Sequence, residues 1–153
     1  MTPQQPAGEN SPRISWTEYF STMSQLVATR STCPRRAVGA VLVRDHRVIA
    51  TGYNGAPSGQ PHCLEVGCLM ENGHCVRTIH AELNALLQCA RYGIATEGAD
   101  LYCTDLPCRF CARALAQAGI QRIFFLRPYD SPETWTLAQS AGIELMQVPE
   151  PPS

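Results

Sequence analysis

The chain has 153 residues, of which 44% are apolar and 16% charged, and its net charge is −1. A chain of this length forms one domain and buries about two-thirds of the surface that its unfolded form exposes. No apolar run approaches the roughly 20 residues of a membrane span, and the small net charge provides no field for holding a nucleic acid. All twelve basic residues are arginine, so the lack of lysine excludes Schiff-base and pyridoxal chemistry.

The two ends of the chain differ in composition from the rest. Residues 1–12 and 149–153 hold half of the twelve prolines and few apolar side chains, which predicts flexible tails around a single domain at 13–148. The first residues have neither a basic region nor an apolar core, so they do not form a secretory signal. We therefore expect a cytoplasmic protein whose eight cysteines stay reduced, where metal binding is commoner than disulfide formation.

The first predicted element is a helix beginning at Ser15, which forms a capping box with Glu18. Apolar residues follow at helical spacing, and the helix is expected to end near Arg30. Two β-rich runs, 38–44 and 47–53, come next and predict a hairpin with a two-residue turn.

The remainder alternates helices and strands. The predicted helices cover 78–91, 108–118 and 131–142, and the predicted strands cover 101–104, 122–126 and 143–148. Two hairpin strands followed by this alternation predict an α/β fold in three layers, with a five-stranded mixed central sheet and helices on both faces. The last crossover makes the final two strands parallel.

One pair of motifs carries the chemistry. His80, Cys108 and Cys111 are nitrogen and sulfur ligands of the kind that zinc prefers, and three protein ligands leave a fourth position for water, whose pKa zinc lowers towards ~7. Glu82 is the acid nearest the ligands; residues two apart face different ways on a helix, so we assign it to proton transfer. Taken alone, the two cysteines also fit a redox pair or half of a structural zinc knuckle, but the joint pattern favours a catalytic zinc.

A second group of possible ligands lies in and before the poorly periodic segment 60–78. These residues are Cys33, Cys63, Cys68 and Cys75, with His74 or His62 as substitutes. Four cysteines predict a closed structural zinc site, although free buried cysteines are also common.

The motifs resemble those of a known family. H-x-E followed by P-C-x-x-C is similar to the signature of zinc-dependent base deaminases. The segments Gly52-Tyr53-Asn54-Gly55 with Pro57, Gly73 to Thr78, and His80 to Ala85 resemble the deoxycytidylate deaminases of the cytidine deaminase superfamily. The resemblance runs from Ser31 to Val148. It implies a cytidine-deaminase-like fold and hydrolytic deamination of dCMP to dUMP and ammonia, which supplies thymidylate synthesis.

The resemblance also assigns residue roles. It implies that His80, Cys108 and Cys111 bind the catalytic zinc, while Glu82 shuttles protons between the water, ring N3 and the leaving ammonia. Asn54 resembles a residue that holds the sugar, and Arg35 and Asn84 are candidates for the 5′-phosphate side. Their simpler interpretations are a solvated arginine and a polar residue on a helix face.

Regulation is a further implication of the resemblance. Members of the family are homo-oligomers, hexameric or built from dimers, activated by dCTP with Mg²⁺ and inhibited by dTTP. The segment Gly52-Tyr53-Asn54-Gly55 resembles the effector segment, and Arg91 matches a position of subunit contact and effector response. Arg91 equally fits a helix-terminal cation that complements the helix dipole.

Three alternative functions share parts of this pattern. A deaminase of another cytosine nucleotide or nucleoside has the same chemistry, and a nucleic-acid base deaminase has the same core but usually a basic surface. A zinc-binding interaction module explains the cysteines but has no use for Glu82. We therefore expect dCMP as the partner, with no nucleic acid and no membrane.

Overall fold

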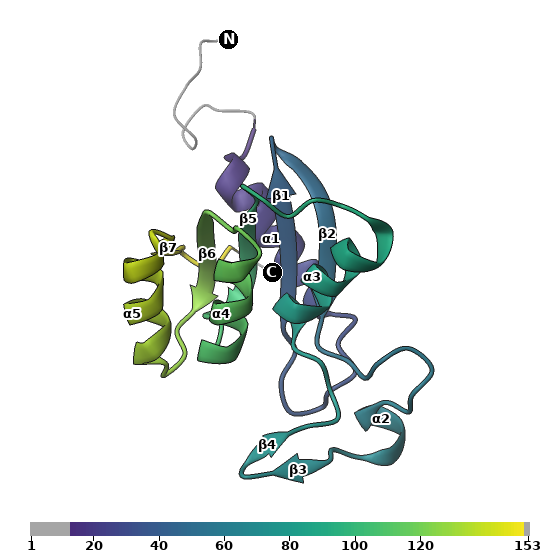
Figure 1. Cartoon of the computed structure of the whole chain (residues 1–153). Coiled ribbons are helices and arrows are strands. Elements are labelled where there is room, and N and C mark those ends of the chain that lie inside the picture. The colour runs from purple at the N-terminus through teal and green to yellow at the C-terminus, as the bar shows by residue number, and fades with distance from the viewer. Residues whose placement is uncertain (1–12, 152–153) are drawn as a thin grey trace.

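The computed structural model describes residues 13–151, which fold around a five-stranded sheet (Figure 1). The strands are β1 (Gly39–Arg44), β2 (Arg47–Tyr53), β5 (Asp100–Asp105), β6 (Arg122–Arg127) and β7 (Glu144–Gln147), in the order β2-β1-β5-β6-β7. β1 is antiparallel to both of its neighbours, whereas β5, β6 and β7 are parallel. The predicted mixed sheet and its parallel last pair are confirmed.

Helices cover both faces of this sheet. α1 (Trp16–Ala28) packs on one face, where Phe20, Val41 and Tyr102 are buried. The larger core lies on the other face, between the sheet and α3 (Ala81–Tyr92), α4 (Arg109–Gln117) and α5 (Pro132–Ala141). The three-layer α/β prediction is therefore confirmed.

The first helix and the hairpin form as their sequences predict. The Ser15 hydroxyl accepts a hydrogen bond from the backbone N–H of Glu18 at 3.1 Å and so caps α1. Asp45 and His46 have φ of 54° and 58°, the left-handed conformations that a two-residue hairpin turn requires. The exposed His46 ring also stacks on Trp16, with 4.4 Å between the ring centroids.

A small irregular unit interrupts the chain between β2 and α3. It contains α2 (Cys63–Val66), β3 (Met70–Glu71) and β4 (His74–Cys75), and it lies at one end of the sheet (Figure 1). The backbone N–H of Leu64 donates to the carbonyl of Thr32 at 3.1 Å. This bond ties the unit to the segment that precedes β1.

The third helix begins at Ala81 and not at the predicted Thr78. Ile79 forms an isolated antiparallel bridge with Gly55, with hydrogen bonds of 2.8 and 3.3 Å in the two directions. Since the backbone groups of Ile79 are committed to Gly55, the helix starts only after His80, which is its N-cap.

Residues 149–151 of the predicted C-terminal tail lie within the described part of the chain. Pro151 is buried, and the Gln25 side chain donates to its carbonyl at 3.4 Å. The predicted N-terminal tail, residues 1–12, lies outside the described residues, as do 152–153. Over residues 13–151, none of the helices has the length and apolar character needed to cross a membrane.

Candidate active site

Two helix N-termini bring the three predicted zinc ligands together. His80 is the N-cap of α3, Cys108 is the N-cap of α4, and Cys111 lies in the first turn of α4. The Nδ1 atom of His80 lies 3.3 Å from Sγ of Cys111 and 3.6 Å from Sγ of Cys108. Because helix N-termini carry partial positive charge, this position favours thiolates.

The geometry of the three ligands fits zinc. Zinc binds sulfur at about 2.3 Å and nitrogen at about 2.0 Å, so a tetrahedral ion places these ligand atoms about 3.5 Å apart. All three ligand atoms lie within 4.8 Å of one another. A histidine with two cysteines leaves one position of a tetrahedral ion for water or substrate, as catalytic zinc sites require.

The pKa values of the two cysteine ligands shift in opposite directions. A hydrogen bond from the Cys111 thiol lowers the pKa of Cys108, and the same bond raises the pKa of Cys111. The hydrogen bond to Cys108 also raises the pKa of His80. These directions favour the thiolate form at Cys108 over that at Cys111.

Glu82 lies in the first turn of α3 and lines the cavity beside the ligands. Its side chain is 4% exposed, and burial raises its pKa from 4.5 to about 7. The negative charges of Cys108 and Asp105 raise this pKa further, while His80 opposes them. A carboxyl group with a pKa near neutrality suits both taking and giving a proton.

The cavity has a volume of about 320 Å³, which is within the range of small-molecule sites. His80, Cys108 and Glu82 form its reactive part. The rest of its wall is mixed: it includes the apolar residues Val38, Ala81 and Leu106 and the polar residues Arg35, Arg36, Asn54, His74 and Tyr129. It therefore offers cations and an amide next to a metal site.

Asn54, predicted to hold the sugar, lies in this wall and is buried. Its side-chain oxygen accepts from the backbone N–H of Val38 at 2.9 Å, and its NH₂ group donates to the carbonyl of Arg36 at 2.7 Å. A carboxamide has two acceptor lone pairs and two donor hydrogens. One of each therefore remains for a ligand.

The two predicted phosphate contacts differ in position. Arg35 lines the cavity, and its guanidinium contacts Sδ of Met70 at 3.2 Å. Asn84 does not line it; its amide donates to the carbonyl of Tyr53 at 2.8 Å. This hydrogen bond joins α3 to the end of β2, and the contact of Asn84 with phosphate stays a prediction.

The segment predicted to bind effectors lies against the N-terminus of α3. A Cβ at Gly52 would overlap the carbonyl oxygen of Ala81, so only glycine allows this close approach. Arg91 lies at the opposite end of α3, exposed, with its guanidinium 5.8 Å from the ring centroid of Tyr92.

Among the cavity residues to which the sequence assigned no role are two charged residues and one aromatic residue: Arg36, Asp105 and Tyr129. Asp105 is buried and forms ion pairs with Arg36 at 2.6 Å and with Arg127 at 3.0 Å. The guanidinium of Arg36 lies 5.1 Å from the ring centroid of Tyr129. The available signal was an aspartate directly after a predicted buried strand and three residues before Cys108.

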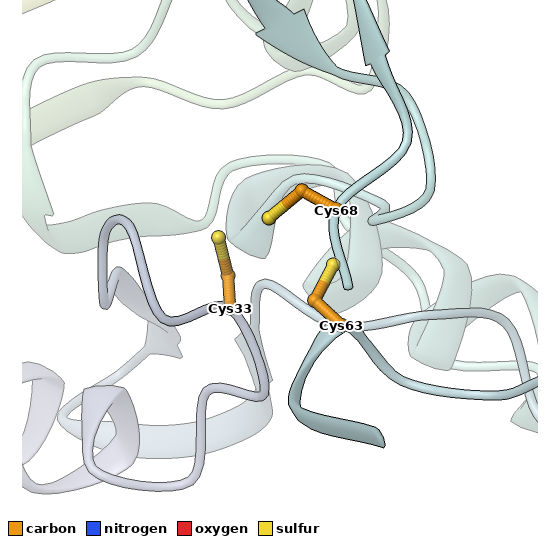
Figure 2. A group of neighbouring side chains, drawn as sticks. All are labelled: Cys33, Cys63 and Cys68. Atoms are coloured by element: carbon orange, nitrogen blue, oxygen red, sulfur yellow. The ribbon is translucent and has the colours of Figure 1, made fainter. Parts of the chain in front are cut away.

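The second cysteine group also assembles. Sγ atoms of Cys33, Cys63 and Cys68 lie within 4.8 Å of one another and point toward a common centre (Figure 2). Sγ of Cys75 lies 3.6 Å from Sγ of Cys63. Four thiols from four separate segments thus meet at the small unit, which is the chemistry of a closed zinc site.

The two histidines proposed as substitute ligands lie beside this group. His74 precedes Cys75 in β4 and lines the cavity. His62 precedes Cys63 as the N-cap of α2, and its Nδ1 atom is buried with no hydrogen-bond partner among the described residues. Cys89 and Cys103, by contrast, are each 1% exposed in the main core.

Comparison with known proteins agrees with this site. Residues 14–127 match the family described as the cytidine and deoxycytidylate deaminase zinc-binding region, so the chain belongs to that family. It is 50% identical over 137 residues to ComE operon protein 2 of Bacillus subtilis, a match that covers 89% of this chain and 72% of that protein.

Two further matches are to proteins that are named as deoxycytidylate (dCMP) deaminases. The chain is 42% identical over 144 residues to the deoxycytidylate deaminase of Schizosaccharomyces pombe, covering 88% of this chain and 44% of the yeast enzyme. The crystal structure of dCMP deaminase from the cyanophage S-TIM5, in complex with dCMP and dUMP, matches with a TM-score of 0.77 and 31% identity. That match covers 86% of this chain and 95% of the phage chain.

Proposed function

We propose that the protein is a zinc-dependent dCMP deaminase that releases dUMP and ammonia. The observation that carries this proposal is a buried carboxyl, Glu82, in a cavity beside three zinc ligands. The deoxycytidylate deaminase names of the yeast relative and of the cyanophage structure support the choice of dCMP.

His80, Cys108 and Cys111 would hold a zinc ion, which would supply a water whose pKa is lowered towards neutrality. Glu82 takes a proton from the attacking water and gives it to ring N3 of cytosine as C4 is attacked. The same carboxylate then takes the proton of the hydroxyl group now on C4 and delivers it to the amino group, which leaves as ammonia while the C4 carbonyl of dUMP forms.

The cavity wall supports a nucleotide substrate. Arg35 and His74 provide groups for a phosphate, and Asn54 provides an amide for the sugar. The net charge of −1 gives no basic field for a nucleic-acid backbone, which disfavours a nucleic-acid deaminase. We place the protein in the cytoplasm because all eight cysteines are free thiols.

A second, structural zinc is part of the proposal. Cys33, Cys63, Cys68 and Cys75 supply four sulfurs, with His74 or His62 as the alternative fourth ligand. Burial raises the pKa of Cys63 to about 12, so a metal is needed to hold it as a thiolate.

Regulation follows from the family resemblance. We propose a homo-oligomer, hexameric or built from dimers, that dCTP with Mg²⁺ activates and dTTP inhibits, through the segment Gly52-Tyr53-Asn54-Gly55 and Arg91. An effector acts only by binding the active arrangement more tightly than the inactive one. A dCMP saturation curve that neither nucleotide changes, from a chain that sediments as a monomer, contradicts this part of the proposal.

The test of the proposed activity is a deamination panel. Zinc-loaded protein is assayed with dCMP, CMP, deoxycytidine, dCTP, guanine and an adenosine-containing tRNA arm. We expect the highest kcat/KM for dCMP, because a site that pairs a phosphate leaves its cation uncompensated when the phosphate is missing. Equal values for dCMP and deoxycytidine would assign the protein to nucleoside deamination.

A further inference from the structure

Asp105 is a buried carboxylate held between two arginines at the edge of the cavity. Its Oδ2 accepts from Nη2 of Arg36 at 2.6 Å, and its Oδ1 accepts from Nη2 of Arg127 at 3.0 Å and from the hydroxyl of Thr104 at 2.7 Å. The Asp105 side chain is 7% exposed, whereas those of Arg36 and Arg127 are 48% and 46% exposed. Both guanidinium groups are therefore partly exposed to solvent, while the carboxylate that they share is buried.

Cross-strand register accounts for the ion pair of Asp105 with Arg127 but not for its ion pair with Arg36. Asp105 and Arg127 are register partners on the parallel β5–β6 ladder, just as Asp100 and Arg122 are at its other end. Asp100 and Arg122 form a comparable ion pair at 2.6 Å. Asp105 differs because it lines the cavity and accepts from a further arginine, which comes from the segment before β1.

Arg36 is fixed from three directions. Its carbonyl accepts from the side chain of Asn54 at 2.7 Å, its guanidinium pairs with Asp105, and the same guanidinium lies over the ring of Tyr129. An arginine that is already ordered loses little side-chain freedom when it binds a ligand. Its planar fork has five donors, of which Asp105 uses one here.

The charge at this wall suits an anion. One carboxylate faces two guanidinium groups, which leaves a net positive charge beside a cavity that also contains Arg35. Phosphate oxygens are the partners that such a fork recognises in bidentate fashion.

We propose that Arg36 is a specificity-determining contact to the 5′-phosphate of the substrate and that Asp105 is the positioning residue that holds its guanidinium toward the cavity. This inference rests on the proposed function, since it names the group that selects a nucleotide over a nucleoside. Asp105 acts through Arg36, so its effect depends on the phosphate and on the presence of that arginine.

The test compares dCMP with deoxycytidine in Arg36→Gln, Asp105→Asn and the double variant. Because the Asp105 charge also raises the pKa of Glu82, each protein is assayed at its own pH optimum. Losing one hydrogen bond to a charged group predicts a rise in KM for dCMP of about 10–100-fold in Arg36→Gln. Asp105→Asn raises that KM about 10-fold, and in both variants kcat/KM falls much less for deoxycytidine than for dCMP.

Two further variants separate positioning from stability. Asp100→Asn removes the matching cross-strand ion pair and is expected to leave the KM for dCMP unchanged. Asp105→Glu keeps the charge and is expected to recover part of the affinity. In the Arg36→Gln background, Asp105→Asn adds no further rise in KM, because the residue that it positions is already gone.

Several results overturn the inference. A lower KM for dCMP in Asp105→Asn would mean that the carboxylate competes with phosphate for Arg36. Equal losses with dCMP and deoxycytidine, or an undiminished effect of Asp105→Asn in the Arg36→Gln background, would mean a structural role alone. If wild-type protein strongly prefers dCMP while both variants keep that preference, the inference fails and the proposed function stands. If the wild-type protein does not prefer dCMP over deoxycytidine, both the inference about Arg36 and the proposed function fail.

Discussion

The position of Glu82 gives its carboxyl group both access to the cavity and a raised pKa. It follows the ligand His80 by two residues and lies in the first turn of α3, so it reaches the cavity without joining the ligand group. Burial keeps its proton, because a charged carboxylate is poorly solvated there. Its catalytic protonation state is therefore set at the expense of stability.

Measuring the unfolding free energy of the zinc-free protein as a function of pH tests whether burial of Glu82 lowers stability. The folded pKa of Glu82 is raised from 4.5 to about 7, so the folded form keeps a proton that the unfolded chain has released. The stabilising effect of the protonated group is complete below about pH 4.5 and is lost as pH rises through about 7. Glu82→Gln does not ionise, and above pH 7 it is expected to exceed the wild type by about 3 kcal/mol in unfolding free energy.

The comparison needs a surface control. Glu144→Gln, at an exposed position on β7, is expected to follow the wild-type curve. If the Glu82→Gln and wild-type curves run parallel from pH 4 to 8, the raised pKa is wrong.

At the scale of elements, local signals predicted most boundaries. The Ser15 cap, the two-residue turn at Asp45 and His46, and the left-handed Gly142 after α5 each act on their nearest neighbours. The start of α3 could not be predicted this way, because the bridge that delays it joins Ile79 to Gly55, which is 24 positions away along the chain. Tertiary hydrogen bonds thus overrode helical periodicity.

The contact between β2 and α3 makes Gly52→Ala a test at this scale. The added methyl group would overlap the carbonyl oxygen of Ala81 and lie 2.5 Å from the backbone N of Ala85. The helix that carries Glu82 must then move, and we expect a loss of about 1–3 kcal/mol in unfolding free energy, together with reduced activity. Chemical denaturation measures the first effect.

Gly55→Ala is the matched control in the same segment. Its added methyl group meets a side-chain oxygen, Oγ1 of Thr32, at 3.3 Å, and a side chain yields more easily than a helix backbone. A larger loss of stability from Gly55→Ala than from Gly52→Ala would contradict the packing argument.

At the scale of the whole molecule, the sequence motifs identified the zinc ligands, but they did not predict which distant residues the fold brings together. The ligands His80, Cys108 and Cys111 carry their own signature in the sequence. Arg36 and Asp105 are 69 positions apart and meet only because β1 and β5 are neighbours in the sheet. No local pattern in a single sequence reports such a pair, so this part of the cavity needed the structure.

Metal content tests the second site of the whole molecule. Protein purified without chelator is expected to hold close to two zinc ions per chain, and Cys63→Ser to hold close to one with a lower Tm, because structural zinc binding contributes folding free energy. Cys89→Ser, at a buried cysteine in the main core, changes no ligand and is expected to keep both ions. One zinc in the wild type, with a Tm that Cys63→Ser leaves unchanged, would exclude the second site.

The zinc site with Glu82 as its proton carrier is expected to deaminate dCMP. The most direct measurement is the rate of dUMP formation from dCMP by wild-type protein and by Glu82→Gln, each with its zinc content determined on the same sample. We expect equal zinc occupancy of the three-ligand site in both proteins and a loss of turnover of about 10²–10⁴-fold or more in Glu82→Gln. Near-normal turnover in Glu82→Gln at full zinc content, or no dUMP from the zinc-loaded wild type, would contradict it.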